Sequence, residues 1–250
     1  MGVNFHWSTL QVPRDDGPHE HMDAYFAYPE AGGPYPAIVV FQEIFGVNEH
    51  IREVCRRIAE RGYVVAAPDI YHRTVQRLEL AYDADGVAEG RKHKDATTFD
   101  GLMRDTRKCI QTLKDRDDVR SDAIGAVGFC FGGHVAFLAA TLEEIKATAC
   151  FYGGGITTMR PGGGEPSVKL APDIKGRVLM LYGDEDQSIP TEQVEEVRTA
   201  LADAGKRYEV RTFVGAGHGF ACDKRQSYKI GAATEAWDMV YAMWAQEFGA

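Results

Sequence analysis

The stretch GFCFGG, residues 128–133, lies between an apolar run at 123–129 and a helical pattern at 131–142. It has the form Gly-x-nucleophile-x-Gly, because a sharp turn from strand to helix leaves room only for small residues on either side of the nucleophile. The turn predicts that Cys130 stands above the end of a sheet, where the N–H of Phe131 can stabilise an oxyanion. Two alternatives are a core cysteine and the glycine-rich turn of a nucleotide binder, although GxGxxG and GxxxxGK[S/T] are both absent.

Short apolar runs alternate with helical patterns on both sides of this turn. Strands are predicted at 22–28, 37–42, 63–67, 123–129, 147–152, 178–182 and 208–214, and helices at 49–61, within 82–116, and at 131–142, 191–203 and 227–248. This alternation predicts an α/β fold with a mostly parallel central sheet and helices on both faces. No linker or repeat divides the chain, so residues 1–250 are expected to form a single domain. Functional sites in such sheets lie at the C-terminal ends of strands.

Two loops downstream of Cys130 follow predicted strands, in the chain order nucleophile, acid, histidine that this kind of sheet uses. His218, within GHGF, is expected to act as the base on Cys130, with a carboxylate fixing its tautomer. Asp186 is favoured as that carboxylate because it occupies the spacing GxxDxxIP. Asp184 is the alternative, and its own alternative role is that of an ordinary turn or capping residue.

The strand at 37–42 runs into EIFGVN, residues 43–48. The N–H of Ile44 is the candidate for a second oxyanion donor. Glu43 is unexpected there, because a carboxylate at the end of a buried strand is costly unless it is paired. One interpretation is a salt bridge with Arg52 or another nearby base, and the other is a second base or regulator beside Cys130.

These motifs together resemble the dienelactone hydrolases, the carboxymethylenebutenolidase group of the α/β-hydrolase superfamily. The matching pieces are QEIFGVN (42–48), GYVVAAPDIY (62–71), GFCFGG (128–133), GxxDxxIP (183–190) and GHGF (217–220). They run in order at compatible spacing, so the resemblance covers most of the chain. It implies an α/β-hydrolase domain over residues 1–250.

The resemblance also implies a mechanism. Cys130, His218 and Asp186 would form a catalytic triad that cleaves an ester or lactone through an acyl-thioester, which water then hydrolyses. Glu43 would keep the thiol neutral at rest and take its proton when substrate arrives. Phe131 and Ile44 would supply the oxyanion hole, and the family needs no metal or organic cofactor.

One part of the resemblance fails. Well-studied members of the family bind the substrate carboxylate with arginines, one of them four residues after the catalytic histidine, where this chain has Cys222. Arg225 is the candidate to replace it, and Arg73 and Arg91 are candidates for the other arginine. The expected substrate is a small anionic ester or lactone. The alternatives are a general carboxylesterase or thioesterase and a non-hydrolytic, thiol-based binding or redox-sensing protein.

Composition excludes several other classes of protein. With 28 basic and 37 acidic residues the formal charge is −9, which does not favour a nucleic-acid or membrane partner. No apolar run is long enough to span a membrane, and the start lacks the pattern of a signal peptide. Five scattered cysteines without a CxxC pair suit a reducing compartment, so a cytoplasmic monomer or homodimer is expected.

Three remaining patterns receive modest interpretations. The sequence HEH at 19–21 is expected to lie in a solvated loop, because no third metal ligand follows at a suitable spacing. The glycines at 153–155 and 162–164 indicate either an anion-binding nest or, preferably, a flexible loop at the rim of the site. The charged run RKHKD at 91–95 is expected to be the solvent-exposed face of a helix.

Overall fold

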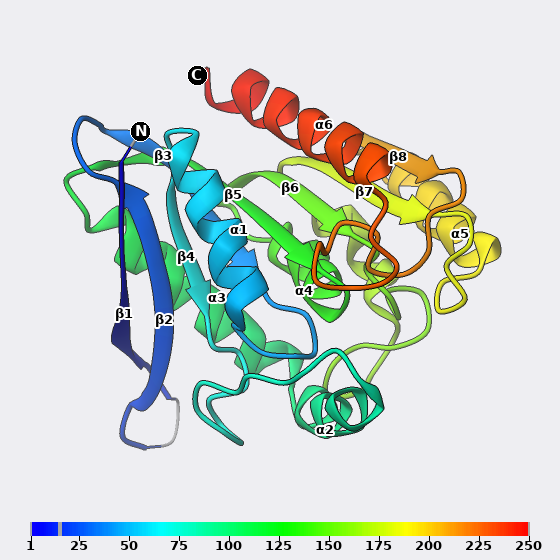
Figure 1. Cartoon of the computed structure of the whole chain (residues 1–250), viewed down its shortest axis with the longest axis horizontal. Helices are drawn as coiled ribbons and strands as arrows, with labels where there is room; N and C mark the ends of the chain where they lie inside the picture. The colour runs from blue at the N-terminus through cyan, green and yellow to red at the C-terminus, as the bar shows by residue number, and fades with distance from the viewer. Residues whose placement is uncertain (1, 15–16, 250) are drawn as a thin grey trace.

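The computed structural model describes residues 2–14 and 17–249, and within them eight strands form one sheet in the order β1-β2-β4-β3-β5-β6-β7-β8 (Figure 1). The pairs β1–β2 and β2–β4 are antiparallel, and every later pair is parallel. The strands are β1 (Val3–Val12), β2 (Glu20–Pro29), β3 (Tyr35–Phe41), β4 (Val64–Pro68), β5 (Val119–Phe129), β6 (Ile145–Phe151), β7 (Arg177–Gly183) and β8 (Tyr208–Phe213).

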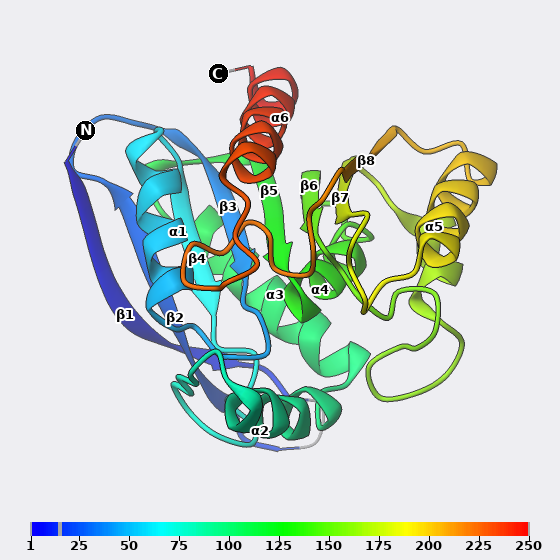
Figure 2. The same ribbon diagram turned by 45° about the vertical axis from the view of Figure 1, so that its right-hand side comes forward.

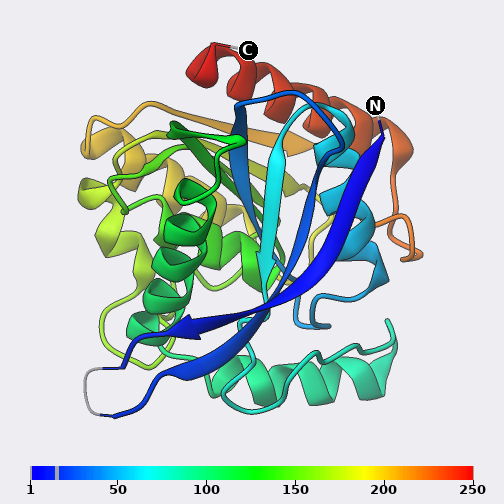
Figure 3. The same ribbon diagram turned by 90° about the vertical axis from the view of Figure 1, so that its left-hand side faces the viewer.

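Helices cover both faces of this sheet. They are α1 (Glu49–Glu60), α2 (Ala84–Asp95), α3 (Phe99–Lys114), α4 (Phe131–Ala139), the 3-10 helix η1 (Ser167–Asp173), α5 (Thr191–Asp203) and α6 (Ile230–Phe248). In Figure 3, α1 (blue to cyan) and α6 (red) lie on one side of the sheet and α3 (green) lies on the other. The predicted fold class, a mostly parallel α/β sheet with helices on both faces, is confirmed.

The pattern of apolar residues explains why the central elements form where they do. Every residue of β4 is buried, as expected for a strand covered on both faces. Helix α1 buries a stripe that includes Ile51, Val54 and Ile58. Asn48 caps this helix by accepting the N–H of Ile51 at 3.2 Å, which fixes the start of α1 directly after the EIFGV segment.

One strand differs from the expectations, and the predicted helical region 82–116 consists of two helices. The sequence does not predict β1, because this edge strand has half of its residues exposed and pairs only with β2. The helical region 82–116 is two helices, since α2 ends at Asp95 and the side chain of Thr98 starts α3 by accepting the N–H of Gly101 at 3.1 Å. Among the described helices, none has the length and apolar character that crossing a membrane requires.

The loops that carry the candidate site come from distant parts of the chain. Figure 2 shows the segments after β7 (yellow) and after β8 (orange) beside the start of α4 (green). Because β3, β5, β7 and β8 are parallel members of one sheet, their C-terminal ends share one edge. This edge is where the predicted nucleophile, acid, histidine and Glu43 come together.

Candidate active site

The turn between β5 and α4 is strained in the way the sequence predicts. Cys130 has φ 55° and ψ −121°, a conformation that few non-glycine residues adopt. A Cβ atom on Gly128 would overlap the carbonyl of Gly132, and one on Gly132 would overlap the carbonyls of Phe41 and Gln42. The glycines therefore let the turn pass close to β3 while Cys130, which is half-buried, points out of it.

Phe131 is the first residue of α4. Its N–H lies in the first turn, where a helix leaves backbone donors without helical acceptors. Ile44 lies in the turn after β3 and lines the same cavity as Cys130 and Phe131. The two backbone groups predicted to form an oxyanion hole are thus on segments that border one cavity.

His218 and Asp186 meet at the ends of β8 and β7. The Nδ1 atom of His218 lies 2.8 Å from Oδ2 of Asp186, whose side chain is fully buried. The other carboxylate oxygen accepts the N–H of Ser188 at 2.8 Å, so both oxygens are engaged. Cys130 lines the same cavity as His218 and acts on the charge of the imidazole. His218 is therefore positioned by Asp186 and borders the same cavity as the thiol.

The charge of His218 reflects these neighbours. Burial opposes the charged imidazolium, but negative charge at Cys130 and the hydrogen bond with Asp186 outweigh it and raise the pKa of His218 to about 10. The ring of Tyr152, which has φ 38° at the end of β6, packs edge-on against His218 with centroids 5.2 Å apart. Tyr152 was not identified from the sequence, because nothing local distinguishes it from the end of a buried strand.

Asp184 has a separate role in the structure. Its Oδ1 atom accepts the N–H of Gly215 at 2.7 Å and so ties the start of the loop after β7 to the turn after β8. Asp184 therefore has the turn role that the sequence analysis gives as its alternative. Its carboxylate binds a backbone N–H group and not His218.

Glu43 is fully buried and forms an ion pair with Arg225. The Nη1 atom of Arg225 donates to Oε1 of Glu43 at 3.2 Å. Arg52, which the sequence suggested as a partner, instead binds Glu49 and Glu79 at the surface. The Oε2 atom of Glu43 has no hydrogen-bond partner among the described residues, so this carboxylate keeps an open acceptor site.

The rest of the Glu43 environment is also built from buried polar groups. The charge of Glu43 acts on His50, whose pKa is lowered because burial outweighs that charge. The Nδ1 atom of His50 lies 3.4 Å from Oδ1 of Asp223, and Arg57 binds the other oxygen of Asp223 at 2.7 Å. Cys222, in the position of the family arginine, is buried, and its pKa is raised to about 11 by burial and by the charge of Glu43.

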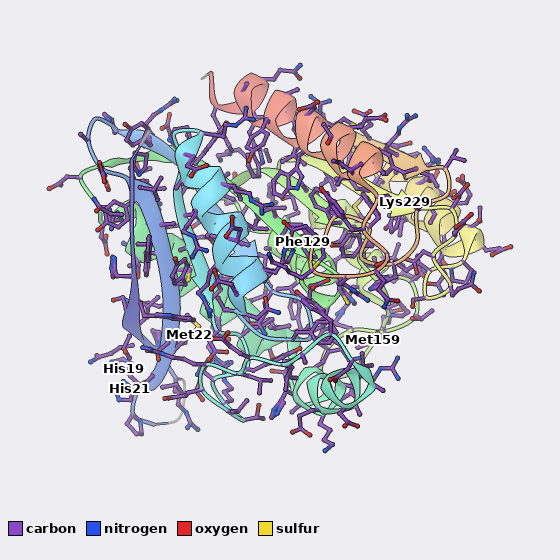
Figure 4. All side chains as sticks on the ribbon, viewed as in Figure 1. His19, His21, Met22, Phe129, Met159 and Lys229 are labelled. Carbon is purple, nitrogen blue, oxygen red and sulfur yellow. The ribbon has the colours of Figure 1, made fainter. Side chains whose placement is uncertain are left out.

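A cavity of about 340 Å³ opens over Cys130 and His218. Its wall includes Ile44, Phe45, Phe131 and Met159. Gly154, Gly155 and Met159 of the segment 153–176 line this cavity, and Met159 is labelled in Figure 4. The glycine-rich segment therefore forms part of the rim of the site, as one of its two interpretations proposed. A cavity of this size suits a small molecule.

The arginines proposed for substrate binding separate into two groups. Arg225 and Arg91 line the cavity. Arg73 is not brought there, because it binds Asp105 through two hydrogen bonds of 2.7 and 2.8 Å and Glu20 at 2.7 Å, beside a different cavity. The buried carboxylate of Asp105 holds this guanidinium, which explains why the candidate fails.

His134 is a lining residue that the sequence reasoning missed. Its Nδ1 atom lies 3.0 Å from the carbonyl oxygen of Gly154, and its Nε2 atom lies 2.7 Å from Oγ of Ser167. Burial lowers the pKa of His134 to about 4, so the ring is neutral. It attaches the rim segment to α4 at Gly154 and at Ser167. Its place one helical turn after Cys130 is the signal that could have identified it.

The expectation that the HEH sequence at 19–21 lies in a loop is wrong for two of its residues, because Glu20 and His21 begin β2 and pair with the end of β1. The sequence lies far from the active site. Figure 4 shows His19 and His21 near the start of β2, at the edge of the molecule, while Phe129 lies in its centre. Among the described residues, no three His, Cys, Asp or Glu side chains are grouped to hold a metal ion.

Comparison with known proteins matches this geometry to one family. A profile of the dienelactone hydrolase family matches residues 22–248. The chain is 41% identical over 247 residues to a Synechocystis sp. protein named "putative carboxymethylenebutenolidase", covering 99% of each chain. An Escherichia coli K12 protein of the same name is 35% identical, over 92% of this chain and 84% of its own. A crystal structure from Klebsiella pneumoniae, titled as a "putative dienelactone hydrolase", superposes with TM-score 0.83 at 33% identity, covering 97% of this chain and 99% of that one.

The fold and these matches define the protein as a carboxylic ester hydrolase with the α/β-hydrolase type of sheet. Within that class, the chain belongs to the dienelactone hydrolase family.

Proposed function

We propose that this protein hydrolyses small anionic esters or lactones with Cys130 as nucleophile, His218 as base and Asp186 as the residue that orients the base. The observation that carries the proposal is the position of His218. It forms a hydrogen bond with Asp186 and, together with Cys130, lines a cavity of about 340 Å³. This arrangement meets the geometric requirement for nucleophilic catalysis by an activated thiol.

The reaction follows from these positions. Cys130 gives its proton to Glu43, and the thiolate attacks the ester carbonyl while the developing oxyanion accepts the N–H groups of Phe131 and Ile44. When the tetrahedral adduct collapses, the imidazolium of His218 gives its proton to the leaving alcohol oxygen and a thioester remains. His218 then takes a proton from water, which attacks the thioester. The carboxylic acid leaves, and the thiolate takes its proton back from Glu43.

Glu43 and Arg225 would couple this chemistry to an anionic substrate. At rest a single hydrogen bond of 3.2 Å joins the two side chains, and Oε2 of Glu43 has no partner among the described residues. A substrate carboxylate at Arg225 competes with Glu43 for the guanidinium. Glu43, relieved of its cation, becomes a stronger base that can take the proton of Cys130. Binding of an anionic substrate would thus favour the ionised thiol.

The five cysteines are free thiols in the structure, and three of them are fully buried in the core away from the site. Free thiols persist in a reducing environment, so we propose that the enzyme acts in the cytoplasm.

The test measures the loss of ultraviolet absorbance of a dienelactone with wild-type protein and with Cys130→Ala, and phenyl acetate is measured alongside. Efficient consumption of the lactone by the wild type alone supports the proposal. Turnover of phenyl acetate but not of the lactone would retain the triad and assign the protein as a general carboxylesterase. Equal activity of Cys130→Ala would overturn the nucleophile assignment.

A further inference from the structure

Helix α2 presents one face to the active-site cavity. Val87, Arg91 and Lys94 follow at spacings of four and three residues, so they lie on the same side of the helix, and all three line the cavity. Gly90 lies on the contact side as well. A Cβ atom there would overlap the carbonyl of Ile44, so the backbone of α2 rests directly against the turn after β3. The two cations are therefore held at the wall of the site.

This finding changes the interpretation of the charged run at 91–95. Lys92 is the solvated member, with its side chain 72% exposed and paired with Glu89. Arg91 makes no hydrogen bond or ion pair within the described part of the chain. Lys94 pairs at 3.0 Å with its neighbour Asp95, whose side chain is 65% exposed. Water screens such a pair strongly, so Lys94 keeps most of its attraction for an anion in the cavity.

The cavity is cationic although the protein is acidic. Apart from His218, which is paired with Asp186, the residues described as lining it that carry positive charge are Arg91, Lys94 and Arg225, and none is an aspartate or a glutamate. The whole chain has a formal charge of −9. Three cations gathered at one cavity of an acidic protein indicate selection of an anionic ligand by that cavity.

The cations occupy two places along the wall. Arg225 lies at the Glu43 end, over the rings of Phe45 and Tyr82, with its guanidinium carbon 5.7 Å from each ring centroid. Lys94 lies near α4 and the rim segment, because its charge acts on His134. Figures 1 and 2 likewise show α2 below the segment between β8 and α6 that carries Arg225.

We infer that the substrate carries two carboxylates, one received by Arg225 and the second by Arg91 and Lys94 on α2. The inference rests on the hydrolysis proposed above and narrows its substrate to dianionic esters or lactones. With one substrate carboxylate bound at Arg225, no anion inside the cavity faces Arg91 and Lys94, because Asp95 does not line it. A second carboxylate would supply that anion. A planar carboxylate also matches the planar guanidinium of Arg91, whose N–H groups make no hydrogen bond within the described residues.

Four esters test this inference by placing a carboxylate on the acyl side, the alcohol side, both or neither. They are phenyl pentanoate, monophenyl glutarate, 4-carboxyphenyl pentanoate and mono-(4-carboxyphenyl) glutarate. We expect wild-type kcat/KM to be highest for the last. In Lys94→Met and Arg91→Gln, kcat/KM for the dianion should fall by about tenfold relative to the better monoanion, as for a lost charge-assisted hydrogen bond.

Lys92→Met is the matched control, since it removes a charge from the same helix outside the cavity, and the dianion-to-monoanion ratio should not change. A drop of equal size for the dianion and the better monoanion in Lys94→Met would show that all three cations hold one anion, and would overturn the inference. So would a ratio that neither α2 variant changes.

Calorimetry with Cys130→Ala separates this inference from the proposed hydrolysis. If none of the esters is hydrolysed by the wild type, the proposed function fails. Binding of the dianion at least tenfold tighter than either monoanion would still support two anion sites. Equal affinity for the dianion and the better monoanion would overturn them.

Discussion

The Nδ1 atom of His218 lies 2.8 Å from Oδ2 of Asp186. Asp184, only two residues earlier in the chain, instead accepts the N–H of Gly215. The fully buried side chain of Asp186 has its second oxygen fixed by the N–H of Ser188. Asp186 can therefore hold one tautomer of the imidazole, whereas Asp184 can only shape the loop.

The first prediction follows from this pair. Asp186→Asn should lower kcat by about 10⁴-fold, because an amide in this position stabilises the wrong tautomer of the histidine. Asp184→Asn preserves an oxygen acceptor for the Gly215 N–H, so its kcat should stay within a few-fold of the wild type. Rates of ester hydrolysis are compared with both variants shown to be folded by circular dichroism. If the larger loss occurs in Asp184→Asn, the acid has been wrongly assigned.

The second prediction concerns pH. Burial opposes the imidazolium, yet Cys130 and Asp186 raise the pKa of His218 from 6.5 to about 10. Between those values the folded state keeps a proton that the unfolded chain releases. The free energy of unfolding should therefore decrease as pH rises from about 6.5 to about 10, in proportion to the proton difference. Urea unfolding at several pH values measures the slope, which should be smaller in His218→Gln.

Cys130→Ala provides the control for this effect. Removing the thiol removes one cause of the raised pKa, so nuclear magnetic resonance should show His218 titrating at lower pH in this variant than in the wild type. A titration that does not move would mean that Asp186 alone sets the charge of the histidine.

The sequence predicts features that depend on neighbouring residues better than features that depend on residues distant in the chain. The strands β3 to β7 and the turn at Cys130 were predictable, because burial on both faces and the need for small residues are written into neighbouring positions. The strand β1 was not, since an edge strand with one partner carries no continuous apolar run.

The sequence suggests Arg225 and Arg91, which line the cavity, but it could not exclude Arg73 or identify Lys94. Arg73 is held by Glu20 and Asp105, which are far from it in the chain and reach it only after β2 and α3 have packed. Lys94 reaches the cavity because Gly90 lets α2 rest on the turn after β3, a close approach that no local pattern records. The triad residues follow one order along the chain, nucleophile, acid and histidine, so they can be identified from the sequence. Each arginine, by contrast, could pair with many different carboxylates.

The third prediction tests the close approach at the nucleophile turn. Gly132→Ala should lower the free energy of unfolding by about 1–3 kcal/mol or more, because the added methyl group overlaps backbone carbonyls of β3 that cannot rotate away. Gly231→Ala is the control, since its Cβ would meet no atom within 4 Å at the start of α6. It should be neutral or stabilising by about 0.4–1 kcal/mol. Similar urea midpoints for the two variants would contradict the tight turn.

The fourth prediction concerns Glu43 and Arg225. Arg225→Met should lower the free energy of unfolding by about 3–5 kcal/mol, because it leaves the fully buried carboxylate of Glu43 without its cation. Adding Glu43→Gln removes the stranded charge and should restore part of that loss. Arg198→Met breaks a pair with Glu195 at the surface and should cost at most about 1 kcal/mol.

Urea unfolding of the two single variants and the double variant completes this thermodynamic cycle. A strictly additive double variant would mean that the two side chains do not interact, and would remove the competition by which a substrate carboxylate is proposed to free Glu43. A coupling in the expected direction would support the proposal that the ion pair keeps Glu43 from taking the proton of Cys130 until an anionic substrate binds. In that case Glu43→Gln should reduce turnover more for anionic esters than for phenyl acetate, because only an anion displaces Glu43 from Arg225.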